Sequence, residues 1–100
     1  MPDTTVMNTI SNWIISTYNT LPGIRIESYY RSNINKHIIT RTTHIGQRHA
    51  ERMICVYIEN VIIKISQHYL NIPNKWLCTM SPTLFEELKE SIDYMLYNHS

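Results

Sequence analysis

Two cysteines and five histidines are the residues of this chain that could serve as nucleophiles, bases or metal ligands. Cys55 and His68 would be the nucleophile and base of a thiol enzyme. Both fall in a segment predicted to be helical, where their spacing would separate them by about 20 Å. Only two glycines are present, which excludes a Gly-rich phosphate-binding loop. The sequence therefore predicts a protein that is not an enzyme.

Metal binding is predicted to be absent for a similar reason. The available side chains lack the helical i, i+4 spacing and the Cys and His spacings of zinc sites. They are Cys55, Cys78, His37, His44, His49 and His68. We expect no metal and no cofactor, and we expect the two thiols to stay reduced inside a cell.

Positive charge is concentrated in the middle of the chain. Six of the nine Lys and Arg residues and three of the five His residues fall between Arg25 and Arg52, although the formal net charge is only +1. The first 24 residues contain a single charged residue, Asp3, and the last 20 contain four carboxylates and one lysine. A net charge this small means that a polyanion would have to bind at a local patch.

The elements that must position this patch begin with a helix and a β-hairpin. Apolar residues with a 3.6-residue period predict a helix over 4–18, with Asp3 or Thr4 as its N-cap. Alternating residues over 24–31 predict a half-buried strand, and an Ile- and Thr-rich run over 37–45 predicts its partner. Two sets of residues could form the inward face of the second strand. These are Ile38, Thr40 and Thr42, or Ile39, Arg41 and Ile45.

The segment 47–70 has the strongest helical pattern in the chain. Apolar residues at helical spacing form a long stripe, and Val56 and Ile63 lie on the opposite side of the predicted helix. Such a helix would be about 36 Å long. The predicted fold is one α+β domain over 1–100. It consists of a helix, a β-hairpin, this long central helix, an apolar segment over 75–80 that could form a short strand, and a C-terminal helix opened by Ser81 and Pro82.

The predicted nucleic-acid site combines one strand face with the start of the long helix. An exposed face with arginines and a tyrosine would bind phosphates, with Tyr29 or Tyr30 stacking on bases. Cations in the first turns of a helix oppose its dipole, and a bound anion would relieve that conflict. The residues assigned to the site are Arg25, Tyr29, Arg31, Arg41, Arg48, His49 and Arg52. The alternative is that these are solvated arginines paired with nearby carboxylates.

The element order is similar to that of double-stranded-RNA-binding domains. The similarity rests on Gly46-Gln47-Arg48-His49, followed by Arg52, at the start of the long helix. In that family a Gly-containing loop and a lysine pair at a helix start grip phosphates. This chain lacks the third strand, the lysine pair and the Ala-rich helix of the family, so the similarity is limited to element order.

A second prediction concerns protein contacts. Charged residues make up only 17% of the chain, against about 25% in an average domain. Apolar helix faces would then hold a dimer partner or another protein, through Trp13, Ile15, Val56 and Ile63. The alternative for Val56 and Ile63 is packing within one chain.

These observations predict a small non-enzymatic binding protein that contacts nucleic acid, RNA rather than DNA, and forms a homodimer. A protein-interaction adaptor or inhibitor is the alternative. The absence of a signal peptide and of a long apolar run predicts a cytoplasmic or nuclear location, without secretion or membrane contact. The composition also suits an accessory protein of a virus or mobile element.

Overall fold

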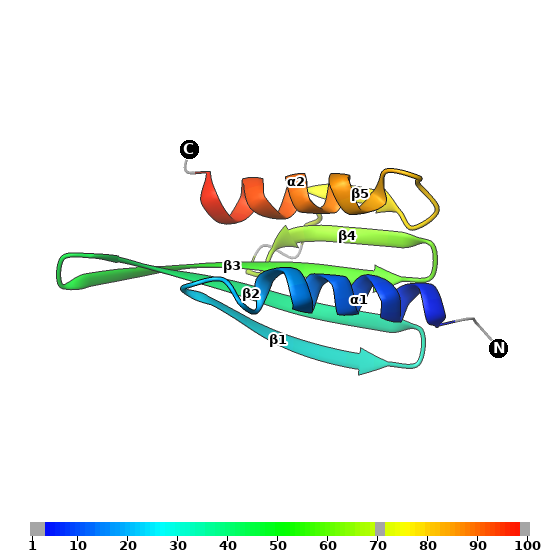
Figure 1. Cartoon of the computed structure of the whole chain (residues 1–100), viewed down its shortest axis with the longest axis horizontal. Coiled ribbons are helices and arrows are strands. Elements are labelled where there is room, and N and C mark those ends of the chain that lie inside the picture. The colour runs from blue at the N-terminus through cyan, green and yellow to red at the C-terminus, as the bar shows by residue number, and fades with distance from the viewer. Residues whose placement is uncertain (1–3, 70–71, 99–100) are drawn as a thin grey trace.

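The computed structural model describes residues 4–69 and 72–98, which form an antiparallel sheet and two helices (Figure 1). Asp3, one of the two predicted N-caps, lies outside the described residues. The elements in chain order are α1 (Thr5–Tyr18), β1 (Ile24–Arg31), β2 (Ile34–Ile45), β3 (Arg48–Glu59), β4 (Ile62–Gln67), β5 (Lys75–Cys78) and α2 (Leu84–Tyr97). Each strand pairs with the next one along the chain, so the five strands form a meander in the order β1-β2-β3-β4-β5.

The predicted long central helix is wrong, and with it the predicted layout of the fold. Residues 48–59 and 62–67 form the antiparallel strands β3 and β4. Ile and Val dominate this region, and such β-branched residues pack well on a pleated sheet. The two-residue turn between the strands depends on Asn60, whose φ of 51° lies in the left-handed region that asparagine tolerates.

Both helices lie on the same face of the sheet. Asn35 and His37 of β2 contact α1, and Arg41 of the same strand contacts α2. Because alternate residues of a strand point to one side, these contacts place α1 and α2 on one face. Ile39 and Arg41 therefore point to the helix side, as in the second predicted set. Ile45, the third member of that set, lies near the end of the β2–β3 hairpin and is 72% exposed. The core lies between this face and the helices, and it includes Ile14, Ile39, Ile54, Val56, Ile63, Leu88 and Ile92, all 0% exposed.

The β2–β3 hairpin extends past the rest of the sheet as a two-stranded arm, which we define as residues 42–51 (Figure 1). β1 pairs with β2 only as far as Arg41, and β4 pairs with β3 only from Ile54 onward. The arm gives the molecule its elongated shape, with extents of 51 × 23 × 22 Å. Gly46, with φ of 63°, occupies the first position of its two-residue loop, where this conformation favours glycine.

A buried polar network joins α1 to the sheet. The His37 ring is 0% exposed, with Nδ1 2.7 Å from Ser28 Oγ and Nε2 2.7 Å from Ser11 Oγ. Asn35 donates to Ser11 Oγ at 2.8 Å and to Asn8 Oδ1 at 3.1 Å. Because Ser11 Oγ already accepts from Asn35, its own hydroxyl can donate to Nε2, which leaves the Nδ1–H to donate to Ser28 Oγ. Burial lowers the pKa of His37 to about 4, so the ring is neutral near pH 7.

The two helices also contact each other near the sheet. Tyr18 of α1 is fully buried and donates to Asp93 Oδ1 of α2 at 2.8 Å. Burial, together with this hydrogen bond to a carboxylate, raises the pKa of Tyr18 far above its ordinary value. The C-terminal helix begins at Leu84 and not at Pro82, and Ser81 Oγ accepts from the Thr83 N–H at 3.3 Å. Among the described residues, neither helix is long and apolar enough to span a membrane.

Candidate functional site

The most distinctive surface is the sheet face opposite the helices. Within the described residues no helix packs on this face, and it carries five side chains in a single line across all five strands. The pairing register places Tyr29 opposite Lys36, Lys36 opposite Tyr57, Tyr57 opposite Lys64, and Lys64 opposite Trp76. We call these five residues the central row. Aromatic rings and lysines alternate along it, one from each strand.

Three of the four neighbouring pairs in the central row have a lysine nitrogen close to an aromatic ring. Lys64 Nζ lies 5.3 Å from the centroid of the Tyr57 ring and 5.2 Å from that of Trp76. Lys36 Nζ lies 6.0 Å from the centroid of Tyr29. Distances up to about 6 Å allow cation–π attraction, which holds each lysine beside a ring. The outer rings are accessible, since Tyr29 is 50% and Trp76 is 55% exposed.

The charge on this face is positive. Outside the arm the uncovered sides of the strands present four cations, Arg25, Arg31, Lys36 and Lys64, and two carboxylates, Glu27 and Glu59. Glu59 lies 3.6 Å from Lys64 Nζ, and Glu27 lies 4.0 Å from Arg25 Nε. The Arg25–Glu27 pair is exposed and the Lys64–Glu59 pair is partly exposed, so solvent weakens both pairs and another anion can replace either carboxylate. The face therefore has an excess of two positive charges.

Glu27 also orients the first ring of the central row. Tyr29 donates its phenolic hydrogen to Glu27 Oε2 at 2.9 Å. This hydrogen bond and the nearby carboxylate charge raise the pKa of Tyr29. The phenol is therefore neutral near pH 7, and no negative charge arises at this end of the row.

A groove of about 540 Å³ runs between the side chains of β1, β2 and β3 on this face. Ile38 forms part of its floor and is only 6% exposed, because longer side chains rise around it. The lining residues are Glu27, Tyr29, Arg31, Ile34, Lys36, Ile38, Met53, Tyr57 and His68. An apolar floor with cationic and aromatic walls suits a flat ring joined to an anionic group.

Arg25, Tyr29 and Arg31, predicted as site residues, lie on this uncovered face in β1. Arg41 and Arg52 lie on the opposite face, at the C-terminal end of α2. Arg41 donates to Leu96 O at 3.2 Å and lies 4.6 Å from the centroid of the Tyr97 ring. Arg52 donates to Met95 O at 3.1 Å and to Asn98 O. These two guanidinium groups bind carbonyls that a helix end leaves unpaired, and they face the negative end of the helix dipole.

Arg48 and His49 lie in the arm, where the sequence had predicted the first turns of a helix. Both are exposed, and the rings of His44 and His49 lie 6.0 Å apart across the hairpin. His44 lies eight residue steps along β2 from Lys36, so the histidine pair is about 27 Å from the central row along the strand. The structure therefore divides the predicted site into three places: the uncovered face, the end of α2 and the arm.

The residues predicted to form a protein interface are divided in a similar way. Val56 and Ile63 are 0% exposed in the core, packed within one chain. Trp13 is half-buried, with its ring 5.1 Å from that of Phe85 and 6.3 Å from that of Tyr18. Ile15 is half-buried on α1.

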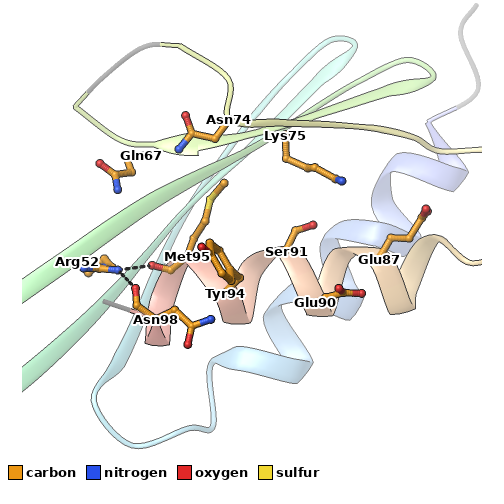
Figure 2. A pocket seen from close by; sticks show the side chains of 10 residues that line it. All are labelled: Arg52, Gln67, Asn74, Lys75, Glu87, Glu90, Ser91, Tyr94, Met95 and Asn98. Carbon is orange, nitrogen blue, oxygen red and sulfur yellow. Dashed lines mark hydrogen bonds between the residues drawn. The ribbon is translucent and has the colours of Figure 1, made fainter. Parts of the chain in front are cut away.

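A second cavity, of about 530 Å³, lies beside α2 on the helix side of the sheet (Figure 2). Arg52 and Lys75 face Glu87 and Glu90 across it, so its charges balance. Figure 2 shows the Arg52 guanidinium bound to the carbonyls of Met95 and Asn98 at one end of this cavity. Tyr94 is an aromatic residue in its lining, but opposite charges balance and Arg52 already holds the helix end. This cavity therefore lacks the excess positive charge of the uncovered face.

The thiol considered as a nucleophile is buried and protonated. Burial raises the pKa of Cys55, against the opposing effect of Lys36. His68, the base considered together with Cys55 in the sequence, follows the end of β4. Within residues 4–69 and 72–98, no group of three or more His, Cys, Asp or Glu side chains is placed to hold a metal ion.

Four of the five central-row residues were not predicted as site residues: Lys36, Tyr57, Lys64 and Trp76. Their signal in the sequence depends on strand register. Once Asn60 is placed in a two-residue turn, Tyr57 and Lys64 must face each other across the hairpin. Comparisons with protein-family models, with curated proteins and with solved structures give no match to this chain.

Proposed function

We propose that this protein binds nucleic acid through the uncovered face of its sheet and carries out no catalysis there. The observation that carries this proposal is the central row, in which two exposed outer rings and a half-buried middle ring, Tyr57, alternate with lysines in strict register. Ring faces stack on bases of any sequence, and lysines neutralise phosphates. Arg25 and Arg31, which flank the row on β1, add phosphate contacts.

The same face is poorly suited to a second protein. An apolar partner covering it would bury four cations, Arg25, Arg31, Lys36 and Lys64. In the described strands outside the arm, the face offers two carboxylates, Glu27 and Glu59, to pair them. An uncompensated buried charge costs several kcal/mol (about 3–5). Val56 and Ile63 belong to the core, so we put forward no adaptor function that uses them.

Salt dependence of binding tests the proposal. We would titrate the protein into a fluorescein-labelled single-stranded oligonucleotide of 12 uridines and measure anisotropy at 50 and 300 mM NaCl. With two to four phosphate contacts, the plot of log K against log salt should have a slope of about −1.4 to −2.8. Affinity should therefore fall by about 10- to 150-fold across this range. Absence of binding at 50 mM, or binding that salt does not change, would contradict the proposal.

A further inference from the structure

We infer that the ligand of the uncovered face is an unpaired strand that crosses the β-strands along the central row, with Tyr29, Tyr57 and Trp76 each stacking on one base. This inference rests on the proposed function. It adds the class of nucleic acid, its direction across the sheet and the residues that stack on its bases.

Ring spacing favours an unpaired strand. The three rings come from β1, β3 and β5, so neighbouring rings are two strand spacings, or about 10 Å, apart. Bases within a duplex are stacked at about 3.4 Å and cover each other's faces. A ring on a flat sheet can reach a base face only when that base is unstacked. A duplex would meet this face with its phosphates alone.

The lysines fall where such a strand would place its phosphates. Lys36 lies between the first and second rings along the row, and Lys64 lies between the second and third. Lys64 Nζ is nearly equidistant from the Tyr57 and Trp76 rings, at 5.3 and 5.2 Å. A backbone linking two bases stacked on these rings must pass between them. Its phosphate would replace Glu59 as the anionic partner of Lys64.

The row also sets the length of the strand. Because it reaches from the edge strand β1 to the edge strand β5, it spans four strand spacings, or about 19 Å. Three nucleotides, one for each ring, are the smallest occupant. About six would cover the same span at the stacked rise of 3.4 Å. Affinity should therefore rise with oligonucleotide length and level off between these two lengths, apart from statistical gains on longer strands.

Ring removal tests the inference. We would compare wild type with Trp76→Leu, Tyr57→Leu and Tyr57→Phe, using labelled single strands of 12 uridines and 12 thymidines and a 12-base-pair RNA duplex. Tyr94→Leu is the matched control, because Tyr94 is 66% exposed on α2, away from the row. Thermal melting identifies variants that lose the fold, and Trp76, at 55% exposure, can be changed with little effect on the core.

Loss of each ring should weaken single-strand binding by about 5- to 150-fold, while Tyr57→Phe and Tyr94→Leu stay within about 2-fold of wild type. The duplex should bind at least about 10-fold more weakly than the single strands. The two single strands report whether RNA or DNA is preferred. If Trp76→Leu and Tyr57→Leu bind as well as wild type, or if the duplex binds as tightly, the inference is wrong although the proposed function stands. If wild type binds none of the three probes, the proposed function itself fails.

Discussion

Changing Lys36 and Lys64 together to glutamate is expected to weaken binding of a 12-uridine strand at 50 mM NaCl by about 100-fold or more. The double substitution removes two phosphate contacts and places two carboxylates at the same points of the central row. The local charge changes by four at sites within one Debye length of the bound backbone. Because both lysines stand on the uncovered face and outside the core, the free energy of unfolding should change by about 1 kcal/mol or less.

The matched control is the double substitution Arg48→Glu and Lys75→Glu. It changes the net charge by the same amount, but Arg48 lies in the arm and Lys75 points to the helix side of the sheet. We expect this control to lose about 10-fold or less, through the general field of the protein. Equal losses in the two variants would mean that net charge, and not the central row, governs binding. A larger loss in the control would move the site away from the uncovered face, to the arm or to the helix side of the sheet.

The second large effect concerns stability and pH. The free energy of unfolding should fall by about 3 kcal/mol as the pH decreases from 7 to 4, through His37 alone. Its pKa is about 4 in the folded protein and 6.5 in an unfolded chain, so in this interval the unfolded state binds the extra proton. The stabilisation is complete above pH 6.5 and is lost as the pH approaches 4. Against a typical total of about 5–15 kcal/mol, this is a substantial fraction.

Urea unfolding of wild type and of His37→Gln at pH 7, 5.5 and 4 measures this effect. The variant lacks the titrating ring but keeps the carboxylates, so the difference between the two slopes isolates His37. In the described part of the chain the ring contacts Ser11, Ser28 and Tyr30, and burial is the cause of its lowered pKa. Parallel pH profiles for the two proteins would show that the network tolerates a protonated ring.

Much of the first half of the fold could be predicted from the sequence. Apolar residues over 4–18 fit only the helical period, and those over 24–31 fit only the alternation of a strand. The helix and the strand are both found where they were expected. Alternation in the strand also correctly separated Ile24 and Ile26 from Arg25, Tyr29 and Arg31. In these segments local pattern and tertiary packing agree.

The middle of the chain could not be predicted in the same way, because its apolar residues fit two periods. Ile54, Ile58, Val61 and Ile65 have helical spacing, while Ile54, Val56 and Ile58 alternate as in a strand. The turn at Asn60 and Val61 contains no glycine or proline, so nothing in its composition interrupts the helical pattern. Dense β-branched residues and the pairing partners offered by β2 decide in favour of the sheet.

The candidate site shows the same division. Clustering of cations in the sequence treated Arg41 and Arg52 as equivalent to Arg25 and Arg31, although the two pairs lie on opposite faces of the sheet. Alternate residues of a strand point to opposite faces of the sheet, so Arg41 and Arg52 face α2 whereas Arg25 and Arg31 lie on the uncovered face. The central row comes from five segments that are distant in the sequence, and only the register of four hairpin pairings brings them into one line.

An NMR titration of the ¹⁵N-labelled protein with an unlabelled six-uridine strand tests the central claim most directly. We predict shifts in the amides of Tyr29, Lys36, Tyr57 and Lys64 and in the indole N–H of Trp76, all with one dissociation constant. Amides of α1 and of residues 44–49 in the arm should move little. Shifts confined to the arm or to α2, or a spectrum that the strand leaves unchanged, would contradict binding at the uncovered face.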